Sequence, residues 1–382
     1  MHRDKHYYIG IMSGTSLDGI DVVIINYQPP NITLLASHCY PIPEELRTQL
    51  LQICTNKIVT LAQLGEIDHR LGLLYADCVL SLLEKANLTS DNIQAIGCHG
   101  QTIYHAPNGH YPFTLQIGDA NIIAAQTGIT TIADFRRKDM ALGGQGAPLV
   151  PAFHQAMFAN PNYNRVILNL GGIANISVLF PQQPIIGYDT GPANVLLDSW
   201  IKQQLNINYD HNAKWAKQGK SNRALLAQLL DEPYFKQPYP KSTGRELFNL
   251  QWLQNKLQTI AIAPEDIQAT LIDLTIHSIV DQLKQLTPTG ALPCELLLCG
   301  GGAKNPLITN GLAAQLSNWN VTTTNSYGID VDYVEAMAFA WFAHQRLHGL
   351  SANLPSVTGA KHSISLGAIY PAISDKEHDN DR

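Results

Sequence analysis

The chain has 382 residues, of which 45% are hydrophobic and 15% charged, and its formal net charge is −6. This length exceeds what one hydrophobic core usually serves, so we expect two domains with a ligand-binding cleft between them. The negative charge leaves no basic surplus for nucleic acid, and no apolar run approaches the roughly 18 residues that span a bilayer. These properties argue against nucleic-acid and membrane partners and favour a small-molecule ligand.

The cysteines and the first residues indicate the compartment. The six cysteines form neither a C-x-x-C pair nor a metal pattern interleaved with histidine, so we expect reduced thiols. The polar start M-H-R-D-K-H leads into an apolar strand without the apolar stretch of a signal peptide. Together these features predict a cytoplasmic protein.

Residues 1–135 alternate strand and helix patterns, which predicts an α/β domain. The expected helices cover 43–54 and 60–86, and the expected strands cover 7–12, 20–26, 32–39, the segment I-Q-A-I-G-C-H-G from Ile93, and 129–135.

The turn G-I-M-S-G-T-S-L-D-G-I-D (10–21) lies between the first two expected strands. Gly14, Thr15, Ser16 and Gly19 bring backbone N–H groups and two hydroxyls into a small volume, which suits a phosphate. A plain β-hairpin, in which glycine and aspartate only satisfy the turn geometry, explains the same residues.

Two polar segments follow the next strands. His99, in C-H-G-Q-T-I-Y-H (98–105), could contact a ligand at the end of a strand, although these residues alone favour a structural histidine. Arg136, in D-F-R-R-K-D (134–139), could clamp a substrate carboxylate or a transferring phosphate, and a solvated charge cluster is the alternative.

Residues 136–370 repeat the plan of the first domain. Strands at 165–170 and 175–180 flank G-G-I-A, so we expect a second α/β domain built like the first. Irregular helices fill 206–268, a helix at 272–286 leads to a strand at 295–300, and a last helix at 334–348 could pack back on the first domain.

The end of the chain carries two further expectations. Trp341 and Phe342, on the apolar side of the last helix, could serve a core or a homodimer interface. The tail at 371–382 has little to bury, so we expect it to be mobile.

Three positions in this second half could carry chemistry. Asp189 follows a short apolar strand and precedes a helix, where it could act as a general base or merely cap the helix. Three glycines, at 300–302, end an apolar strand and would let a nucleotide approach the backbone, or form only a tight turn. Glu335 stands in the first turn of the last helix, where it suits the helix dipole and could also bind a sugar hydroxyl.

Six segments of the chain together resemble the 1,6-anhydro-N-acetylmuramic acid kinases. They are the turn at 10–21, C-H-G-Q-T-I-Y-H, D-F-R-R-K-D-M-A-L-G-G-Q-G-A-P-L-V-P, N-L-G-G-I-A-N-I-S, G-Y-D-T-G-P-A-N and E-A-M-A-F-A, and their order and spacing agree with that family. The resemblance implies the actin-like and hexokinase-like ATPase fold, in which two ribonuclease-H-like α/β domains close a cleft around ATP and a sugar.

The resemblance also implies roles for individual residues. Asp189 would be the catalytic base, Arg136, Glu335 and His99 would face the sugar, and Asp18 could serve Mg²⁺ or only the turn. The ATP-binding residues would be Gly14, Thr15, Ser16, Leu17, Asp18, Gly19, Ile20, Asp21, Gly171, Gly172, Gly300, Gly301 and Gly302.

The implied reaction converts ATP, 1,6-anhydro-N-acetylmuramate and water into ADP and N-acetylmuramate 6-phosphate, a step in cell-wall recycling. Two other functions stay open at this point. The chain could be an ordinary hexose or amino-sugar kinase, or a sugar sensor that binds ATP without phosphorylating its ligand.

Overall fold

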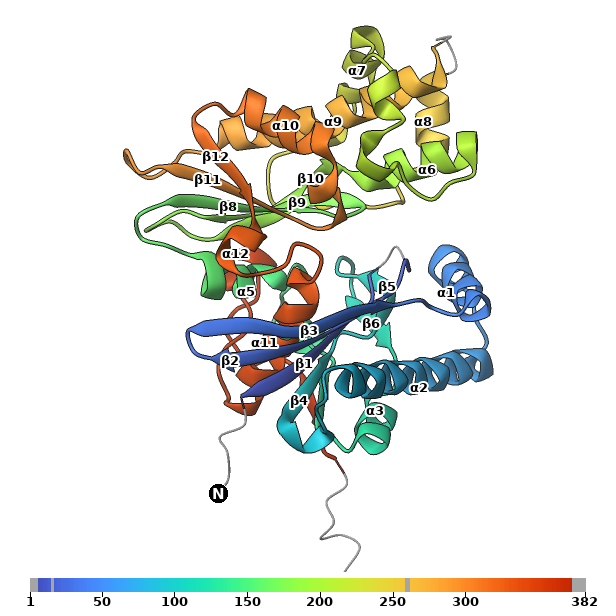
Figure 1. Cartoon of the computed structure of the whole chain (residues 1–382), viewed down its shortest axis with the longest axis vertical. Helices are drawn as coiled ribbons and strands as arrows, with labels where there is room; N and C mark the ends of the chain where they lie inside the picture. The colour runs from blue at the N-terminus through green and yellow to red at the C-terminus, as the bar shows by residue number, and fades with distance from the viewer. Residues whose placement is uncertain (1–5, 15–16, 258–261, 373–382) are drawn as a thin grey trace, which may run out of the picture. The chain divides into compact units, whose positions relative to one another are not determined.

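The computed structural model describes residues 6–14, 17–257 and 262–372 (Figure 1). The chain forms two compact units: the first unit comprises 1–157 and 333–382, and the second unit comprises 158–332. The division therefore differs from the expected boundary at 135/136. The loop after residue 135 belongs to the first unit because Arg136 and Asp139 make their hydrogen bonds with residues of that unit. Of the tail expected to be mobile, 373–382 lies outside the described residues.

The first unit is built on a sheet of six strands in the order β13-β7-β4-β1-β2-β3. β1, β2 and β3 form an antiparallel meander. β4 runs parallel to β1, β7 runs parallel to β4, and β13 is an antiparallel edge strand. The strands are β1 (Tyr7–Met12), β2 (Ile20–Gln28), β3 (Asn31–Tyr40), β4 (Ile93–Cys98), β7 (Thr131–Ala133) and β13 (Ala368–Tyr370).

Helices cover both faces of this sheet. Alternate residues of β1 point to opposite faces: Ile9 and Ile11 join the core formed with α1 and α2, and Gly10 lies against α11. The helices of the first unit are α1 (Glu44–Asn56), α2 (Leu61–Lys85), α3 (Ala120–Thr127), α4 (Arg137–Ala141), α5 (Val150–Phe158), α11 (Val334–Leu347) and α12 (Pro355–Thr358). A separate hairpin of β5 (Gln101–Ala106) and β6 (Phe113–Ile117), which the sequence did not predict, follows β4.

The second unit repeats the sheet of the first. Its strand order is β10-β9-β8-β11-β12, again with an antiparallel meander followed by two parallel strands. The strands are β8 (Asn164–Leu170), β9 (Ile173–Leu179), β10 (Ile186–Pro192), β11 (Cys294–Cys299) and β12 (Trp319–Thr323). The prediction of two ribonuclease-H-like α/β domains is confirmed by this shared order and direction of strands.

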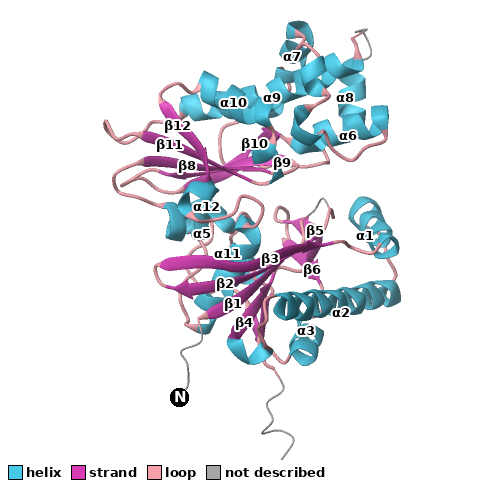
Figure 2. Cartoon of the chain, in the orientation of Figure 1, coloured by secondary structure: helices cyan, strands magenta, loops and turns pink. Residues whose placement is uncertain are grey.

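The longer helices of the second unit lie on one face of its sheet (Figure 2), where their apolar residues join those of the strands in a core. They are α6 (Asn194–Leu205), α7 (Arg223–Leu230), α8 (Leu250–Leu257), α9 (Pro264–Gln285) and α10 (Pro306–Gln315). Short 3-10 helices include η4 (Pro233–Lys236), η5 (Gly301–Lys304) and η6 (Thr324–Tyr327).

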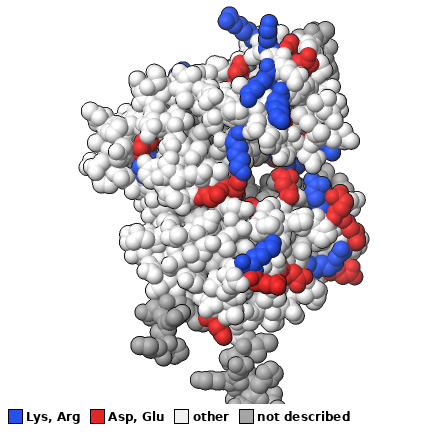
Figure 3. All heavy atoms as spheres, viewed as in Figure 1, with Lys and Arg blue, Asp and Glu red and all other residues white. Residues whose placement is uncertain are grey.

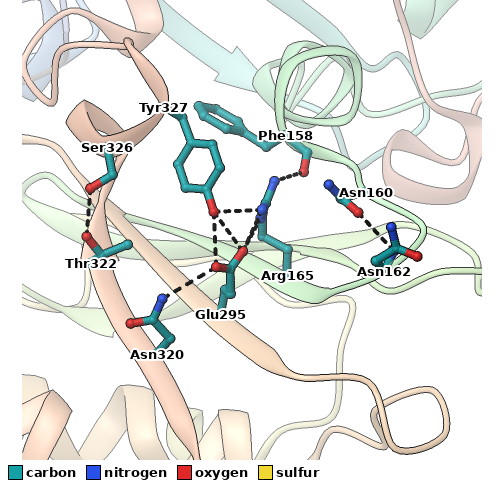
Figure 4. A network of polar contacts seen from close by, with 9 residues as sticks. All are labelled: Phe158, Asn160, Asn162, Arg165, Glu295, Asn320, Thr322, Ser326 and Tyr327. Carbon is teal, nitrogen blue, oxygen red and sulfur yellow. Dashed lines mark hydrogen bonds and ion pairs between the residues drawn. The ribbon is translucent and has the colours of Figure 1, made fainter.

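A buried ion pair joins β8 to β11 in the second unit (Figure 4). Arg165 and Glu295 are cross-strand neighbours, and their side chains are 3% and 6% exposed. The Tyr327 hydroxyl donates to Glu295, and the guanidinium of Arg165 lies 4.3 Å from the centre of the Tyr327 ring. Arg165 also donates to the carbonyl of Phe158, so the network fixes the start of the second unit to its sheet.

The surface agrees with the low content of charged residues. Figure 3 shows Lys, Arg, Asp and Glu side chains over only part of the face drawn, with uncharged residues between them. Within the described ranges, no helix has both the length and the apolar character that a membrane crossing requires.

Candidate functional site

The predicted site residues gather at one edge of each sheet. In the first unit Gly14, His99 and Arg136 follow the parallel strands β1, β4 and β7 at their carboxyl ends. In the second unit Gly171 and Gly300 follow the parallel strands β8 and β11 in the same way. Ligands of open α/β sheets bind at this edge, so each unit by itself carries a candidate ligand-binding edge.

The turn between β1 and β2 is a hairpin, and hydrogen bonds from neighbouring residues stabilise it. The buried Ser13 hydroxyl donates to Gln101 over 2.7 Å, and the Leu17 N–H donates to the Gly14 carbonyl over 3.2 Å. Arg47 donates from Nε to the Leu17 carbonyl over 3.0 Å. The hairpin geometry is confirmed, whereas Thr15 and Ser16, two of the expected phosphate contacts, lie outside the described residues.

The other turn residues differ in what they can offer a ligand. Leu17 and Ile20 are fully buried in the core of the first unit, which gives them a structural role in shaping the turn. Asp18, in contrast, is exposed.

Arg136 and His99, predicted separately, are bonded to each other. The guanidinium donates from Nε and Nη2 to Nε2 of His99 over 3.1 and 2.9 Å, and from Nη1 to the Gly146 carbonyl over 2.8 Å. Burial and the adjacent guanidinium hold the pKa of His99 well below its usual 6.5. Because the imidazole is therefore neutral and accepts at Nε2, it orients Arg136 without competing for an anion.

Glu335 lies in the first turn of α11, and two glycines set the position of that helix. Gly10 of β1 and Gly97 of β4 are neighbours in the sheet, and a Cβ on either would lie within 1.9 Å of a carbonyl oxygen of α11. The helix therefore lies directly on the sheet. Burial raises the pKa of Glu335, Arg136 lowers it, and Asp21 raises it, so these three charged groups of the first unit lie close enough to influence one another.

Asp139, which the sequence did not single out, supports the loop that carries Arg136. Its buried carboxylate accepts hydrogen bonds from the Gly146 N–H, the Asn353 amide and the Thr358 hydroxyl over 2.8, 2.7 and 2.8 Å. Gly146 in turn supplies the carbonyl that Arg136 contacts. No local pattern could reveal this carboxylate, because two of its partners lie more than 200 positions along the chain.

Asp189 lies within β10, three residues before its end, and not after the strand as expected. The first residue before α6 is Ala193, which makes no side-chain cap, so the helix-cap alternative for Asp189 is wrong. The carboxylate is partly buried and accepts a hydrogen bond from the Thr243 N–H to Oδ2 over 3.0 Å. Burial, opposed by that hydrogen bond and aided by the charge of Glu246, raises the pKa of Asp189 to about 6.

The glycine turns of the second unit lie beside each other. The Asn194 side chain, at the start of α6, donates to Leu170 at the end of β8, and a Cβ on Gly302 would lie 2.7 Å from the Leu170 side chain. The carbonyls of Gly171 and Gly172 accept the first N–H groups around the α6 start. Gly171, Gly172 and the triple glycine thus lie close together in the second unit.

Gly300 and Gly301 have different reasons to be glycine. Gly300 has a φ of +78°, and a Cβ there would lie 2.4 Å from Asn169 Oδ1, so the fold itself requires it. A Cβ on Gly301 would meet nothing within 4 Å, so packing leaves space above this residue. The first bond of η5 runs from the Ala303 N–H to the Gly300 carbonyl over 2.9 Å, and the Gly300 N–H donates to the Val331 carbonyl over 2.7 Å.

Among the described residues, no three His, Cys, Asp or Glu side chains are grouped to hold a metal ion.

Comparisons with known proteins point to one family. A family model described as anhydro-N-acetylmuramic acid kinase matches residues 6–372. The chain is 60% identical to the anhydro-N-acetylmuramic acid kinase of Pasteurella multocida, with 98% of this chain and 99% of that protein covered. It is 55% identical to the enzyme of the same name from Haemophilus influenzae, with coverages of 97% and 99%.

Similarity among solved structures is more distant. Component A of (R)-2-hydroxyglutaryl-CoA dehydratase from Acidaminococcus fermentans has a TM-score of 0.49 and 11% identity, with 90% of this chain and 99% of that chain covered.

Proposed function

We infer the activity of this chain from its family, because it belongs to the anhydro-N-acetylmuramic acid kinases. It uses ATP and water to open 1,6-anhydro-N-acetylmuramic acid and to phosphorylate the oxygen released at C6. The products are N-acetylmuramate 6-phosphate and ADP, and the reaction serves cell-wall recycling.

The environment of Asp189 is the observation that supports its assignment as the base. A carboxylate with its pKa raised to about 6 is ionised at neutral pH and still basic enough to accept a proton in the transition state. Asp189 takes a proton from water as the water oxygen bonds to the anomeric carbon. The bond from that carbon to the bridging oxygen breaks, and the bridging oxygen then bonds to the γ-phosphorus as ADP departs.

The sugar is held by the charged residues of the first unit. Arg136 is a fixed cation, oriented by His99 and Gly146, and suits the lactyl carboxylate of a muramic sugar. Glu335, in the first turn of α11, is the proposed acceptor of a hydrogen bond from a sugar hydroxyl. Both assignments predict that the affinity for the sugar depends on residues of the first unit.

The ATP phosphates are bound by N–H groups of the glycine turns. The proposed phosphate contacts are Gly14 and Gly19 of the first hairpin and Gly171 and Gly172. Gly300 to Gly302 are proposed to lie near the nucleoside, and the N–H of Gly300 already donates to the Val331 carbonyl. When bound with the nucleotide, Mg²⁺ would supply positive charge against that of the phosphates during transfer. Asp18 is the proposed protein group facing that ion, through water, because its carboxylate is exposed.

We also propose a cytoplasmic location, which the six free cysteines support, since disulfides are rare in reducing compartments. A homodimer stays a proposal without an assigned surface. Trp341 and Phe342, which could have formed an interface, are 4% and 0% exposed and belong to the core of the first unit.

A coupled assay of ADP release over a panel of sugars tests the activity. We expect turnover with 1,6-anhydro-N-acetylmuramate and little with glucose, N-acetylglucosamine or N-acetylmuramate. Turnover with an ordinary hexose alone would indicate a conventional sugar kinase, and binding without ADP release would indicate a sensor.

Two variants sharpen this assay. Asp189→Asn should lower kcat by about 10²–10⁴-fold and keep sugar binding, as expected for loss of a general base. Asp231→Asn is the matched control, because Asp231 is an exposed aspartate of the same unit whose partner is Lys236 on the surface. A fully active Asp189→Asn enzyme would contradict the proposed role.

A further inference from the structure

Residues 239–246, here called the strap, run beside β10 in the second unit. β10 is an edge strand of its sheet, so in the part of the chain that the structure describes no strand pairs with its outer side. The strap takes that place at one residue: the Asp189 N–H donates to the Lys241 carbonyl over 3.3 Å, and the Thr243 N–H donates to Asp189 Oδ2 over 3.0 Å. The backbone and the carboxylate of Asp189 are thus both held by the same short segment.

Lys241 fastens the strap from inside the unit. Its side chain is buried, with 8% of the residue exposed, and Nζ lies 3.3 and 3.4 Å from the carbonyls of Tyr234 and Phe235. The same ammonium lies 4.8 Å from the centre of the Tyr234 ring. Lys241 therefore joins the strap to η4 by two hydrogen bonds and a cation–π contact.

The contacts return from η4 to Asp189. The Tyr234 hydroxyl donates to the carbonyl of Asp189 over 2.7 Å. The strap, η4 and β10 are therefore linked in a closed ring of contacts, and Asp189 is bound at its N–H, its carbonyl and one carboxylate oxygen.

We propose that the strap positions Asp189 for catalysis: the Thr243 N–H fixes Oδ2, and Oδ1 is the oxygen that receives the proton from water. The inference rests on the proposed role of Asp189 as the base. Oδ1 accepts no hydrogen bond from any residue that the structure describes, so its lone pairs are available for the reaction. Thr243 and Lys241 are positioning residues, because neither needs to touch the substrate.

The Thr243 hydrogen bond also sets the acidity of the base. Burial and the charge of Glu246 raise the pKa of Asp189, and the Thr243 N–H lowers it. Without that N–H the carboxylate would hold its proton to higher pH. A hydrogen bond to an ionised group is worth enough to move the titration by about 1–2 pH units.

Amide NMR on the intact protein labelled with ¹⁵N-threonine tests the hydrogen bond without disturbing the fold. The Thr243 signal is assigned by its disappearance in Thr243→Ala, which keeps the backbone N–H. We expect the Thr243 amide proton to move downfield as pH rises, with a midpoint near 6, and to stop titrating in Asp189→Asn. A Thr243 signal that does not titrate, or that titrates unchanged in Asp189→Asn, would overturn the inference.

Kinetics then test the positioning role. Thr243→Pro deletes the N–H and should move the acidic limb of the kcat/KM profile to higher pH by about 1–2 units. It should also lower kcat with little change in the KM for sugar. Thr243→Ala keeps the N–H, so its acidic limb should stay near the original pH. Equal limbs in the two variants would reject the role. If Asp189→Asn proves fully active, the proposed function fails; if it is inactive and the Thr243 amide does not titrate, only the strap inference fails.

Discussion

Gly97→Ala should lift α11 from the sheet of the first unit and displace Glu335 with it. A Cβ at position 97 would lie 1.9 Å from the carbonyl oxygen of Phe339, and real contacts of this kind stay above 3.0 Å. The helix would have to withdraw by more than 1 Å across a closely packed interface. The same crowding exists at Gly10, so the sheet cannot yield by a shift along the helix.

The expected cost follows from this overlap. Overpacking a core destabilises by about 1–3 kcal/mol, which lowers the thermal midpoint of a unit of this size by roughly 2–12 °C. Gly65→Ala is the matched control, because Gly65 lies in α2 and a Cβ there meets nothing within 4 Å. That change should stabilise by about 0.5–1 kcal/mol, since glycine is a poor helix former.

Thermal unfolding followed by circular dichroism measures both variants, and the KM for sugar reports the position of Glu335. We expect Gly97→Ala to melt earlier and to bind sugar more weakly, with Gly65→Ala unchanged in KM. A Gly97→Ala protein as stable as the parent would refute the packing argument. A lower thermal midpoint with an unchanged KM for sugar would contradict the proposed contact between Glu335 and the sugar.

Three further changes probe the buried polar groups. Below pH 6, kcat/KM should fall about tenfold per pH unit because Asp189 becomes protonated, and a profile flat to pH 5 would contradict its role as base. Asp139→Asn should lower the free energy of unfolding in urea by about 2–4 kcal/mol and raise the KM for sugar, since three buried hydrogen bonds depend on the carboxylate; unchanged urea unfolding would refute this. Arg165→Met should destabilise by about 3–5 kcal/mol by leaving Glu295 buried alone, and adding Glu295→Leu should recover most of that loss; a double variant no more stable than the single would reject the explanation.

The sequence predicted the elements that local patterns encode. Apolar alternation around two glycine turns located both β-hairpins that begin the sheets, and the helical spacing at 334–348 located α11. The sequence did not predict the short strands β12 and β13 or the β5–β6 hairpin. Segments this short or this polar show no clear alternation of apolar and polar residues. The domain boundary was not predicted for another reason. The side chains of loop 136–148 form hydrogen bonds with residues of the first unit, and these partners are visible only in the folded structure.

The candidate site was predicted as single residues and not as a set of contacts. His99 and Arg136 were proposed independently, and their hydrogen bond joins positions 37 apart. Nothing in the sequence showed the role of Gly10 and Gly97. They let α11 approach the sheet closely, and the sequence does not show which helix packs against which strands. Thr243 acts through its backbone N–H, which every residue except proline possesses, so no residue type could reveal it.

The reaction carried out in ¹⁸O-labelled water tests the central claim, that Asp189 activates a water which attacks the anomeric carbon while the bridging oxygen takes the phosphoryl group. Mass spectrometry of the product should place the label on the anomeric carbon and none on the phosphate. Unlabelled reaction product incubated in the same water for the same time controls for chemical exchange. A product without label at the anomeric carbon would contradict the account.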